Sequence, residues 1–197
     1  TDKLGTVYTF GQVTTTRQNK DGAATTTFRW MLEEVRDRND NYISYEYFKD
    51  NGQIYPSKIT YTGNASTAGP FEVSFARTAN ADVATTTATG FPVKTYYKIS
   101  EIDVKIDGSL VRSYSLGYSN GYKNINKVLT SIIEAGRSQS GATTTLPAAT
   151  FEYNAGFDPI WAVDAGFGTT TMNALIANEG CGLGGWKDLG ARVSDVN

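Results

Sequence analysis

The stretch Ile99–Tyr118 reads ISEIDVKIDGSLVRSYSLGY, and it decides the class of fold that the sequence predicts. Apolar and charged residues alternate through its first half, with Ile102, Val104 and Ile106 on one face and Glu101, Asp103, Lys105 and Asp107 on the other. Because alternate residues of a strand point to opposite faces, this half is predicted as a half-buried strand. Asp107-Gly108 then supplies two residues that tolerate positive φ, as a tight hairpin turn requires. The chain is therefore expected to return as an antiparallel strand over Leu110–Tyr118.

The same pattern recurs along the chain. Tyr42–Phe48 is rich in aromatic and β-branched residues, and Asp50-Asn51-Gly52 follows as a turn before a second strand over Gln53–Thr62. Strands that follow one another through short turns predict an all-β fold, built as an antiparallel meander of hairpins. Further strands, each bounded by Gly, Pro, Asn or Asp, are predicted at Thr6–Val13, Phe71–Arg77, Asn126–Glu134 and Ala149–Tyr153.

Two segments fit more than one pattern. Phe28–Arg38 satisfies both helical spacing and strand alternation, and strand is the preferred interpretation. Met172–Asn178 carries apolar residues at helical offsets before Gly180, which is compatible with one short helix. The core is expected to gather Trp30, Leu32, Val35, Ile43, Tyr45, Ile102, Val104 and Ile106.

Composition supports a folded β protein and excludes two classes of partner. Of the 197 residues 40% are hydrophobic and 19% charged, and 12 Tyr and 9 Phe favour strands. The formal net charge is −2 and no run of Lys or Arg occurs, so nucleic acid is not an expected partner. No apolar run approaches the roughly 20 residues of a membrane span. Neither end resembles a natural terminus, so we expect the chain to be part of a longer polypeptide.

The composition changes near Ala155. Residues 1–154 are rich in Tyr and in predicted strands, whereas residues 155–197 are rich in Gly, interleaved with Trp161 and Trp186. We therefore predict a sheet domain over 1–154 and a second, Gly-rich module over 155–197.

The residues that carry most enzyme chemistry are missing or unpaired. The chain has no histidine, which removes the usual nucleophile-activating base and the commonest zinc ligand. Cys181 stands in a Gly-rich stretch without a nearby base. The carboxylate pairs available to a glycosidase are Glu33 with Glu34 and Glu101 with Asp103; the first pair is adjacent and the second lies on a solvated face. The prediction is that this segment is not an enzyme.

Two stretches offer oxygen ligands to calcium. Asp37–Asn41 has them at alternate positions, but a solvated β-turn is the preferred interpretation. Asp195-Val196-Asn197 matches the first positions of an Asp-x-Asn-x-Asp-Gly calcium loop, and Asp195 and Asn197 are therefore the candidate metal ligands. Two side chains do not fill a calcium shell, so no cofactor is expected in this segment, and calcium is expected only in the full-length protein.

Several motifs, in order over residues 28–153, resemble the toxin-complex B component and plasmid-virulence B families, which are related to tyrosine-aspartate (Rhs/YD) repeats. The first is Trp30-x-Leu32-x-x-Val35-x-Asp37-x-Asn39-x-Asn41-x-Ile43-x-Tyr45-x-Tyr47. Asp40 stands where the family hairpins carry Gly, and Asp also tolerates positive φ. The later motifs are Pro56–Gly63, Phe71–Phe75, Val111–Tyr118, Leu129–Ile132 and Leu146–Tyr153. Trp161–Asn197 is similar to the start of the family's FG-GAP-like propeller repeats.

This resemblance implies a secreted bacterial protein without enzymatic activity of its own in this segment. It implies a β-shell that, together with a partner toxin-complex subunit and other parts of the same long polypeptide, encloses or presents a toxin payload. The Gly-rich module is then expected to begin a β-propeller-like domain.

A different class of function stays open from the residues alone. Aromatic residues such as Tyr96, Tyr97, Trp161 and Trp186 could stack on host surface glycans, which would make the chain an extracellular adhesion or glycan-binding module. Five Thr-Thr-Thr triplets, starting at residues 14, 25, 85, 143 and 169, are expected on strands or strand-flanking loops.

Overall fold

The computed structural model describes residues 1–20, 23, 25–121, 127–138 and 141–153. All of them belong to one unit, Thr1–Asn154. Residues 155–197, with the predicted helix at Met172–Asn178 and the propeller-like module, lie outside the described residues. The described elements are β1 (Val7–Phe10), the 3-10 turn η1 (Thr14–Thr16), β2 (Arg17–Asn19), β3 (Thr27–Trp30), β4 (Leu32–Arg36), β5 (Asn41–Asp50), β6 (Gln53–Asn64), β7 (Phe71–Thr86), β8 (Val93–Ile106), β9 (Ser109–Asn120), β10 (Lys127–Arg137), β11 (Thr143–Thr145) and β12 (Ala149–Thr150).

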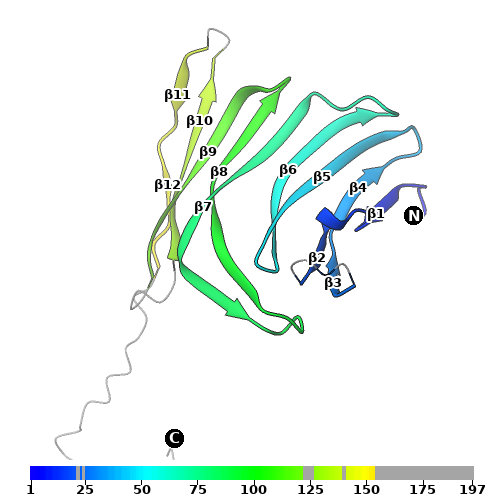
Figure 1. Ribbon diagram of the computed structural model, residues 1–197. Helices are drawn as coiled ribbons and strands as arrows, with labels where there is room; N and C mark the ends of the chain where they lie inside the picture. The colour runs from blue at the N-terminus through cyan, green and yellow to red at the C-terminus, as the bar shows by residue number, and fades with distance from the viewer. Residues whose placement is uncertain (21–22, 24, 122–126, 139–140, 154–197) are drawn as a thin grey trace, which may run out of the picture. The chain divides into compact units, whose positions relative to one another are not determined.

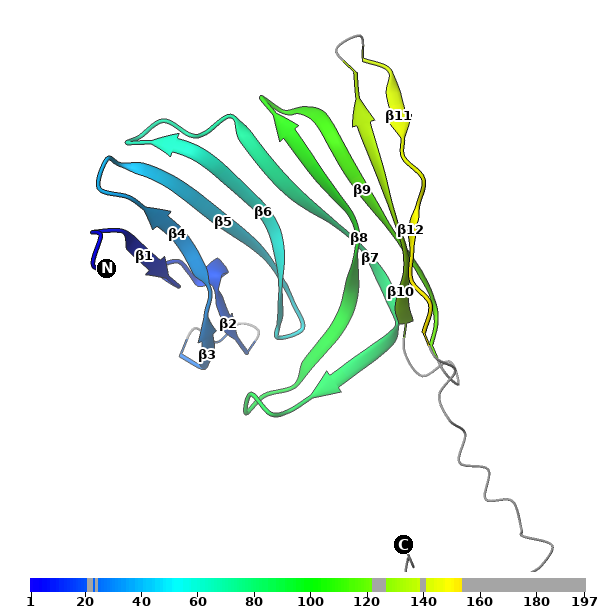
Figure 2. The same cartoon turned by 180° about the vertical axis from the view of Figure 1, so that it is seen from behind.

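Most of these strands form one antiparallel sheet. Its order is β1-β4-β5-β6-β7-β8-β9-β10-β11, with β12 also paired to β10, while β2 and β3 form a separate two-stranded sheet. From β4 to β10 each strand pairs with the next in sequence, so the sheet is a meander. Figures 1 and 2 show it as one curved and twisted layer, with β2 and β3 near its N-terminal edge. The all-β antiparallel prediction is confirmed.

Both predicted hairpin turns are present, and their backbone angles explain their sequences. Asn51 and Gly52 have φ of 49° and 76°, and Asp107 and Gly108 have φ of 48° and 74°. Two successive residues with positive φ match the right-handed twist of the flanking strands, and Asn, Asp and Gly adopt them at the lowest cost. Asp40, which replaces the family's Gly, also has a positive φ, of 63°.

The ambiguous segment Phe28–Arg38 is extended, as preferred, but it is split. β3 pairs with β2, whereas β4 pairs with β1 and β5. Met31 lies between the two strands, where its backbone N–H donates to Thr16 O and its carbonyl accepts from Gly11 N. The same extended stretch therefore serves two sheets.

The predicted core differs from the structure in two ways: two of its eight residues are exposed, and the other six are only half-buried. Trp30 is 54% exposed and Ile106 is 37% exposed. Among the described hydrophobic residues only Tyr55, Phe91 and Val93 are buried. A single sheet layer, with no second layer described over most of it, leaves even its apolar face partly open. Alternation predicted the face of each residue but not what covers that face.

Polar side chains hold the small sheet against the end of the β5–β6 hairpin. Thr16, Gln18 and Asn19 are all buried. The Gln18 side-chain amide donates to Gly52 O at 3.0 Å, and Lys49 donates to Thr14 O at 3.2 Å and to the Asn19 side chain. Because these polar groups are paired, their burial carries little desolvation penalty.

Candidate assembly surfaces

One face of the main sheet is apolar over β5 to β8, and further along, on β9 and β10, the same face carries the ion pair of Arg112 with Glu134 at 3.2 Å. Residues that pair directly across strands share a face, and Tyr45, Ile59, Val73 and Val104 pair in sequence from β5 to β8. These four residues form one row across the sheet. A second row on the same face contains Phe75, Ile102 and Tyr114, and a third contains Tyr61, Phe71 and Ile106. The Tyr61 and Phe71 rings stack with centroids 5.2 Å apart. This set of three rows is called the apolar face below.

The opposite face is polar and charged. Glu46, Lys58, Ser74, Asp103 and Ser113 pair in sequence from β5 to β9, which places all five on one face. Lys58 Nζ lies 2.7 Å from Glu46 Oε1, and this hydrogen bond raises the pKa of Lys58. Lys105 Nζ lies 3.5 Å from Asp103, 3.8 Å from Glu72 and 2.9 Å from Ser74 Oγ. Such partly exposed ion pairs add little stability but keep the surface soluble.

The turn between β4 and β5 is ordered by one carboxylate. Asp37 Oδ1 accepts from the backbone N–H groups of Asn39 and Asn41 at 2.8 and 2.9 Å, and its Oδ2 accepts from the Asn41 side chain at 2.8 Å. The side-chain bond from Asn41, with the two backbone bonds, lowers the pKa of Asp37. Both oxygens are used within the turn, so the preferred β-turn interpretation of Asp37–Asn41 is confirmed.

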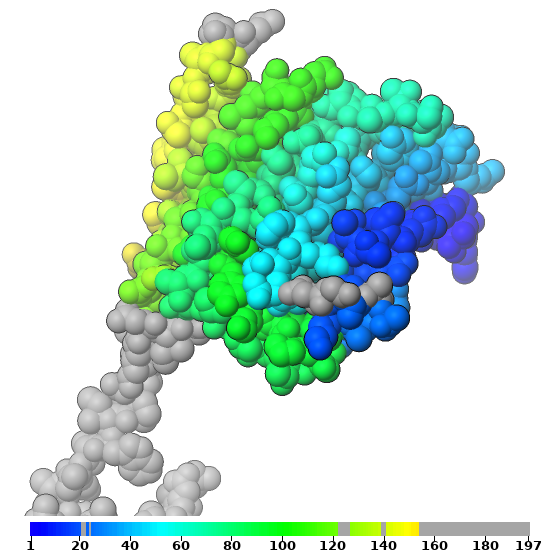
Figure 3. All heavy atoms as spheres, in the orientation of Figure 1, coloured from blue at the N-terminus to red at the C-terminus, as the bar shows by residue number. Residues whose placement is uncertain are grey.

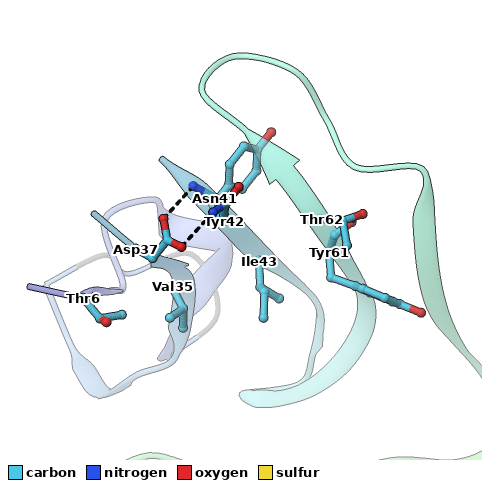
Figure 4. A pocket seen from close by; sticks show the side chains of 8 residues that line it. All are labelled: Thr6, Val35, Asp37, Asn41, Tyr42, Ile43, Tyr61 and Thr62. Carbon is cyan, nitrogen blue, oxygen red and sulfur yellow. Dashed lines mark hydrogen bonds between the residues drawn. The ribbon is translucent and has the colours of Figure 1, made fainter. Parts of the chain in front are cut away.

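A shallow hollow lies beside this turn (Figure 4). Its volume is about 320 Å³, and its walls are mostly apolar. It is lined by Thr6, Val35, Asp37, Asn41, Tyr42, Ile43, Tyr61 and Thr62. Since the Asp37 carboxylate is bonded within its own turn, the hollow offers a ligand a surface of apolar contacts and few free polar groups.

Three of the four carboxylates that could have served a glycosidase, Glu33, Glu34 and Asp103, have separate structural roles. Glu33 Oε2 accepts from Gln12 N at 2.9 Å, Val13 N at 3.2 Å and Thr16 Oγ1 at 2.8 Å, which fixes the loop before β2. Glu34 instead pairs with Arg36 at 2.8 Å. Asp103 pairs with Lys105. Alternation in the sequence could not reveal that Glu33 binds a loop 17 to 21 residues earlier.

Of the other candidate residues, Tyr96 is half-buried and lines a hollow of about 260 Å³ together with Asp50 and Asn51, so the glycan-stacking alternative stays untested there. The Tyr97 ring packs edge-on against Phe48 and Tyr55, with centroids 5.6 and 5.8 Å apart, so it is not free to stack on a sugar. The predicted calcium ligands Asp195 and Asn197, together with Cys181, Trp161 and Trp186, lie outside the described residues. Within the described ranges, no group of three or more acidic, Cys or His side chains is placed to hold a metal ion.

Taken together, the described residues form an open sheet that is apolar on one face over β5 to β8 and charged on the other. The hollow beside the Asp37 turn is shallow. No helix in the described part of the chain is long and apolar enough to cross a membrane.

Several solved structures of toxin complexes have a similar fold. The chain superposes on a chain of the Photorhabdus luminescens Tc holotoxin pore with a TM-score of 0.65 and 17% identity, covering 76% of this chain and 10% of that one. A crystal structure of TcdB2-TccC3-Cdc42 gives a TM-score of 0.64 at 16% identity, with the same coverage. The N-terminal domain of the effector SpvB from Salmonella typhimurium gives 0.49 at 15% identity.

The superpositions on the two toxin-complex chains show the fold, although the sequences are only 16% and 17% identical. No protein-family model and no curated protein matches the sequence. The predicted resemblance to toxin-complex B proteins is confirmed as a likeness of fold. The chain spans about a tenth of the length of the toxin-complex chains that it matches.

Proposed function

We propose that this chain is a non-enzymatic wall segment of a large secreted bacterial toxin-complex-like protein. With other parts of the same polypeptide and a partner toxin-complex subunit, the wall encloses or presents a toxin payload. The single observation that supports this best is the open sheet layer with two chemically different faces, whose architecture is shared with chains of Tc toxins.

The two faces suggest how the wall is oriented. A charged surface with ion pairs is compatible with bulk water, whereas a continuous apolar surface is stabilised by contact with another apolar chain. We therefore assign the charged face to the outside of the wall and the apolar face to the side of the payload. The non-enzymatic assignment is supported by Glu33, Glu34 and Asp103, whose carboxylates are used in structural contacts.

The test uses the longer polypeptide that carries this segment, purified with its partner subunit. Electron microscopy is expected to show a hollow particle with this sheet in its wall, and the payload is expected to resist added protease. A compact particle without an internal space, or a payload digested as fast as the free payload, would contradict the proposal.

Two adjacent residues of β9 test the orientation. Tyr114 lies on the apolar face, and Ser115 lies on the charged face opposite Glu101. Each new Lys lies opposite a carboxylate of a neighbouring strand, Glu134 for Tyr114→Lys and Glu101 for Ser115→Lys, so the two variants are matched in charge and pairing. Tyr114→Lys is expected to speed digestion of the payload, and Ser115→Lys to leave it unchanged. If hollow particles form with both variants and only Ser115→Lys exposes the payload, the assignment of the faces is reversed.

A further inference from the structure

The hollow that Tyr96 lines lies between two hairpins of the main sheet. Its volume is about 260 Å³, and it is lined by Asp50, Asn51, Ala79, Asn80, Tyr96 and Tyr97. The first two residues belong to the tip of the β5–β6 hairpin, and the others belong to β7 and β8. Figures 1 and 3 show the outer end of the β7–β8 hairpin, in green, beside the tip of the β5–β6 hairpin, in cyan. These four strands lie inside the strand order, so no free sheet edge contributes to the hollow.

A β-bulge in β7 interrupts the sheet beside Tyr96. The two strands lose their register between the pairs Ala79–Tyr97 and Ala84–Thr95, and five residue steps of β7 there face two of β8. Tyr96 lies within this interval and has no register partner on β7. Bulges re-aim side chains and are frequent next to functional sites. The irregularity therefore gives Tyr96 a setting that differs from that of its neighbours in the ladder.

Backbone hydrogen bonds hold the walls of the hollow in place. The backbone N–H of Lys94 donates to Asn51 O at 3.1 Å, which ties the tip of the β5–β6 hairpin to β8. The backbone N–H of Tyr96 donates to the hydroxyl of the buried Tyr55 at 3.0 Å. Because these bonds use main-chain groups, the side chains of Asn51 and Tyr96 are positioned without being consumed. Such support from outside the lining preorganises a binding site.

Three side chains of the hollow keep their binding capacity. Within the part of the chain that the structure describes, the Asp50 carboxylate and the Asn51 side-chain amide form no hydrogen bond or ion pair, and the Tyr96 ring has no ring partner. The Asn80 side chain is occupied, because its Nδ2 donates to Asp82 O at 2.8 Å. A carboxylate accepts hydrogen bonds and an amide both donates and accepts them, so Asp50 and Asn51 together can serve neighbouring hydroxyl groups. The half-buried Tyr96 ring adds an apolar surface.

We propose that this hollow is a binding subsite for one neutral pyranose ring. Tyr96 contacts the C–H face of the sugar, Asp50 accepts from its hydroxyl groups, and Asn51 donates to them and accepts from them. An acidic sugar would meet the Asp50 carboxylate as a like charge. A basic side chain would leave the N–H donors of Asn51 unused, because an ammonium group has no acceptor.

The size of the hollow agrees with a single ring. Pockets for drug-sized ligands have volumes of about 300–1,000 Å³, and this hollow lies just below that range. The inference concerns a surface between two hairpins and does not depend on the proposed function.

The test titrates the isotope-labelled 197-residue chain with the methyl glycosides of glucose, mannose, galactose and N-acetylglucosamine. Nuclear magnetic resonance follows the backbone amides. The amide signals of Asn51, Asn80 and Tyr96 are expected to shift in a saturable manner with at least one glycoside. The dissociation constant is expected to be on the order of 1 mM, because one ring in a shallow hollow makes few contacts.

Two variants and a matched control locate the binding. Asn51→Gly removes the amide and keeps the turn, because Gly readily adopts the φ of 49° at this position. Asp107→Gly is the control, since Asp107 has a φ of 48° at the same place in the β8–β9 turn. Asn51→Gly and Tyr96→Ala are each expected to raise the dissociation constant at least about fivefold, and Asp107→Gly to change it by less than about twofold.

Circular dichroism verifies that each variant keeps its strands. The absence of saturable shifts with all four glycosides would overturn the proposal. So would equal weakening by Asn51→Gly and Asp107→Gly, which would place the sugar away from the hollow. N-acetyl-lysine amide is titrated as the competing probe. If it shifts the amides of Asn51 and Tyr96 and no glycoside does, the hollow accepts a basic side chain and the sugar assignment is wrong.

Discussion

The Tyr55 hydroxyl accepts a hydrogen bond from the backbone N–H of Tyr96 at 3.0 Å, which joins β6 to β8 across a gap of 41 residues. These strands are not neighbours in the sheet, because β7 pairs with both of them. Tyr55 is 8% exposed, and its ring lies in a cluster with Phe48 and Tyr97. This contact therefore ties three successive hairpin strands together where the sheet has its few buried residues.

Tyr55→Phe is expected to destabilise the chain by about 1–2 kcal/mol, because the part-buried N–H of Tyr96 loses its acceptor while the ring is kept. Urea unfolding measures the change in free energy. Tyr45→Phe is the control, since the Tyr45 hydroxyl has no hydrogen-bond partner among the described residues, and its effect is expected below about 0.5 kcal/mol. Equal effects of the two variants would show that the hydroxyl of Tyr55 contributes nothing.

Burial separates two aromatic residues that the sequence does not distinguish. Phe91 is 6% exposed. Phe91→Ala is expected to lower the free energy of unfolding by about 3–5 kcal/mol, because a cavity replaces a packed ring. Trp30→Ala removes a 54% exposed ring and is expected to cost about 1 kcal/mol or less. The same unfolding measurement checks both, and a larger cost for Trp30→Ala would place the packed core elsewhere.

Acid stability depends on the turn at Asp37. The pKa of this carboxyl is lowered, by the Asn41 side chain first and then by backbone N–H groups. The ionised Asp37 therefore contributes to folding stability above the unfolded pKa of about 3.9. This contribution is lost as the pH falls through the lower, folded pKa. Asp37→Asn keeps an acceptor but removes the ionisation, so the loss of stability below about pH 4 is expected to be smaller in the variant. The free energy of unfolding of the wild type and of Asp37→Asn is measured between pH 2 and 6, about the titration range of this carboxyl. If Asp37 were not involved, the two proteins would lose stability equally as the pH falls.

Glu33 is predicted to control the loop before β2. Glu33→Ala removes three hydrogen bonds from one carboxylate oxygen and is expected to cost about 1–2 kcal/mol, since water replaces part of the loss at the exposed amides. Amide exchange at Gln12 and Val13 should quicken. Glu101→Ala serves as the control, because the Glu101 side chain forms no ion pair or hydrogen bond with a described residue. Unchanged exchange at both amides would contradict the role of Glu33.

Calcium binding is expected to depend on residues beyond the candidate ligands Asp195 and Asn197. A calcium ion takes about 6–8 oxygen ligands, so two side chains bind it weakly. A longer polypeptide that completes the Asp-x-Asn-x-Asp-Gly pattern should bind it and melt at a higher temperature with calcium than with chelator. Equal melting temperatures in both conditions would leave Asp195 and Asn197 as parts of an ordinary turn.

Much of the main sheet could be predicted from short-range chemistry. The hairpins at Asn51-Gly52 and Asp107-Gly108 follow from residues that tolerate positive φ, and the faces of β8 follow from alternation. The same reasoning failed for Trp30 and Ile106, which are exposed. Alternation reports which side chains share a face, but burial depends on a second layer that local sequence does not encode.

The sequence by itself determined the antiparallel meander, the positions of its main turns and the chemistry of its two faces, because these depend on neighbouring residues and on a period of two. Only the tertiary structure decided that β3 leaves the main sheet and that Glu33 fastens a distant loop. It also decided that the few buried side chains gather around Tyr55. These features join residues far apart in the chain, and such contacts depend on the curvature and packing of the whole sheet rather than on local preference.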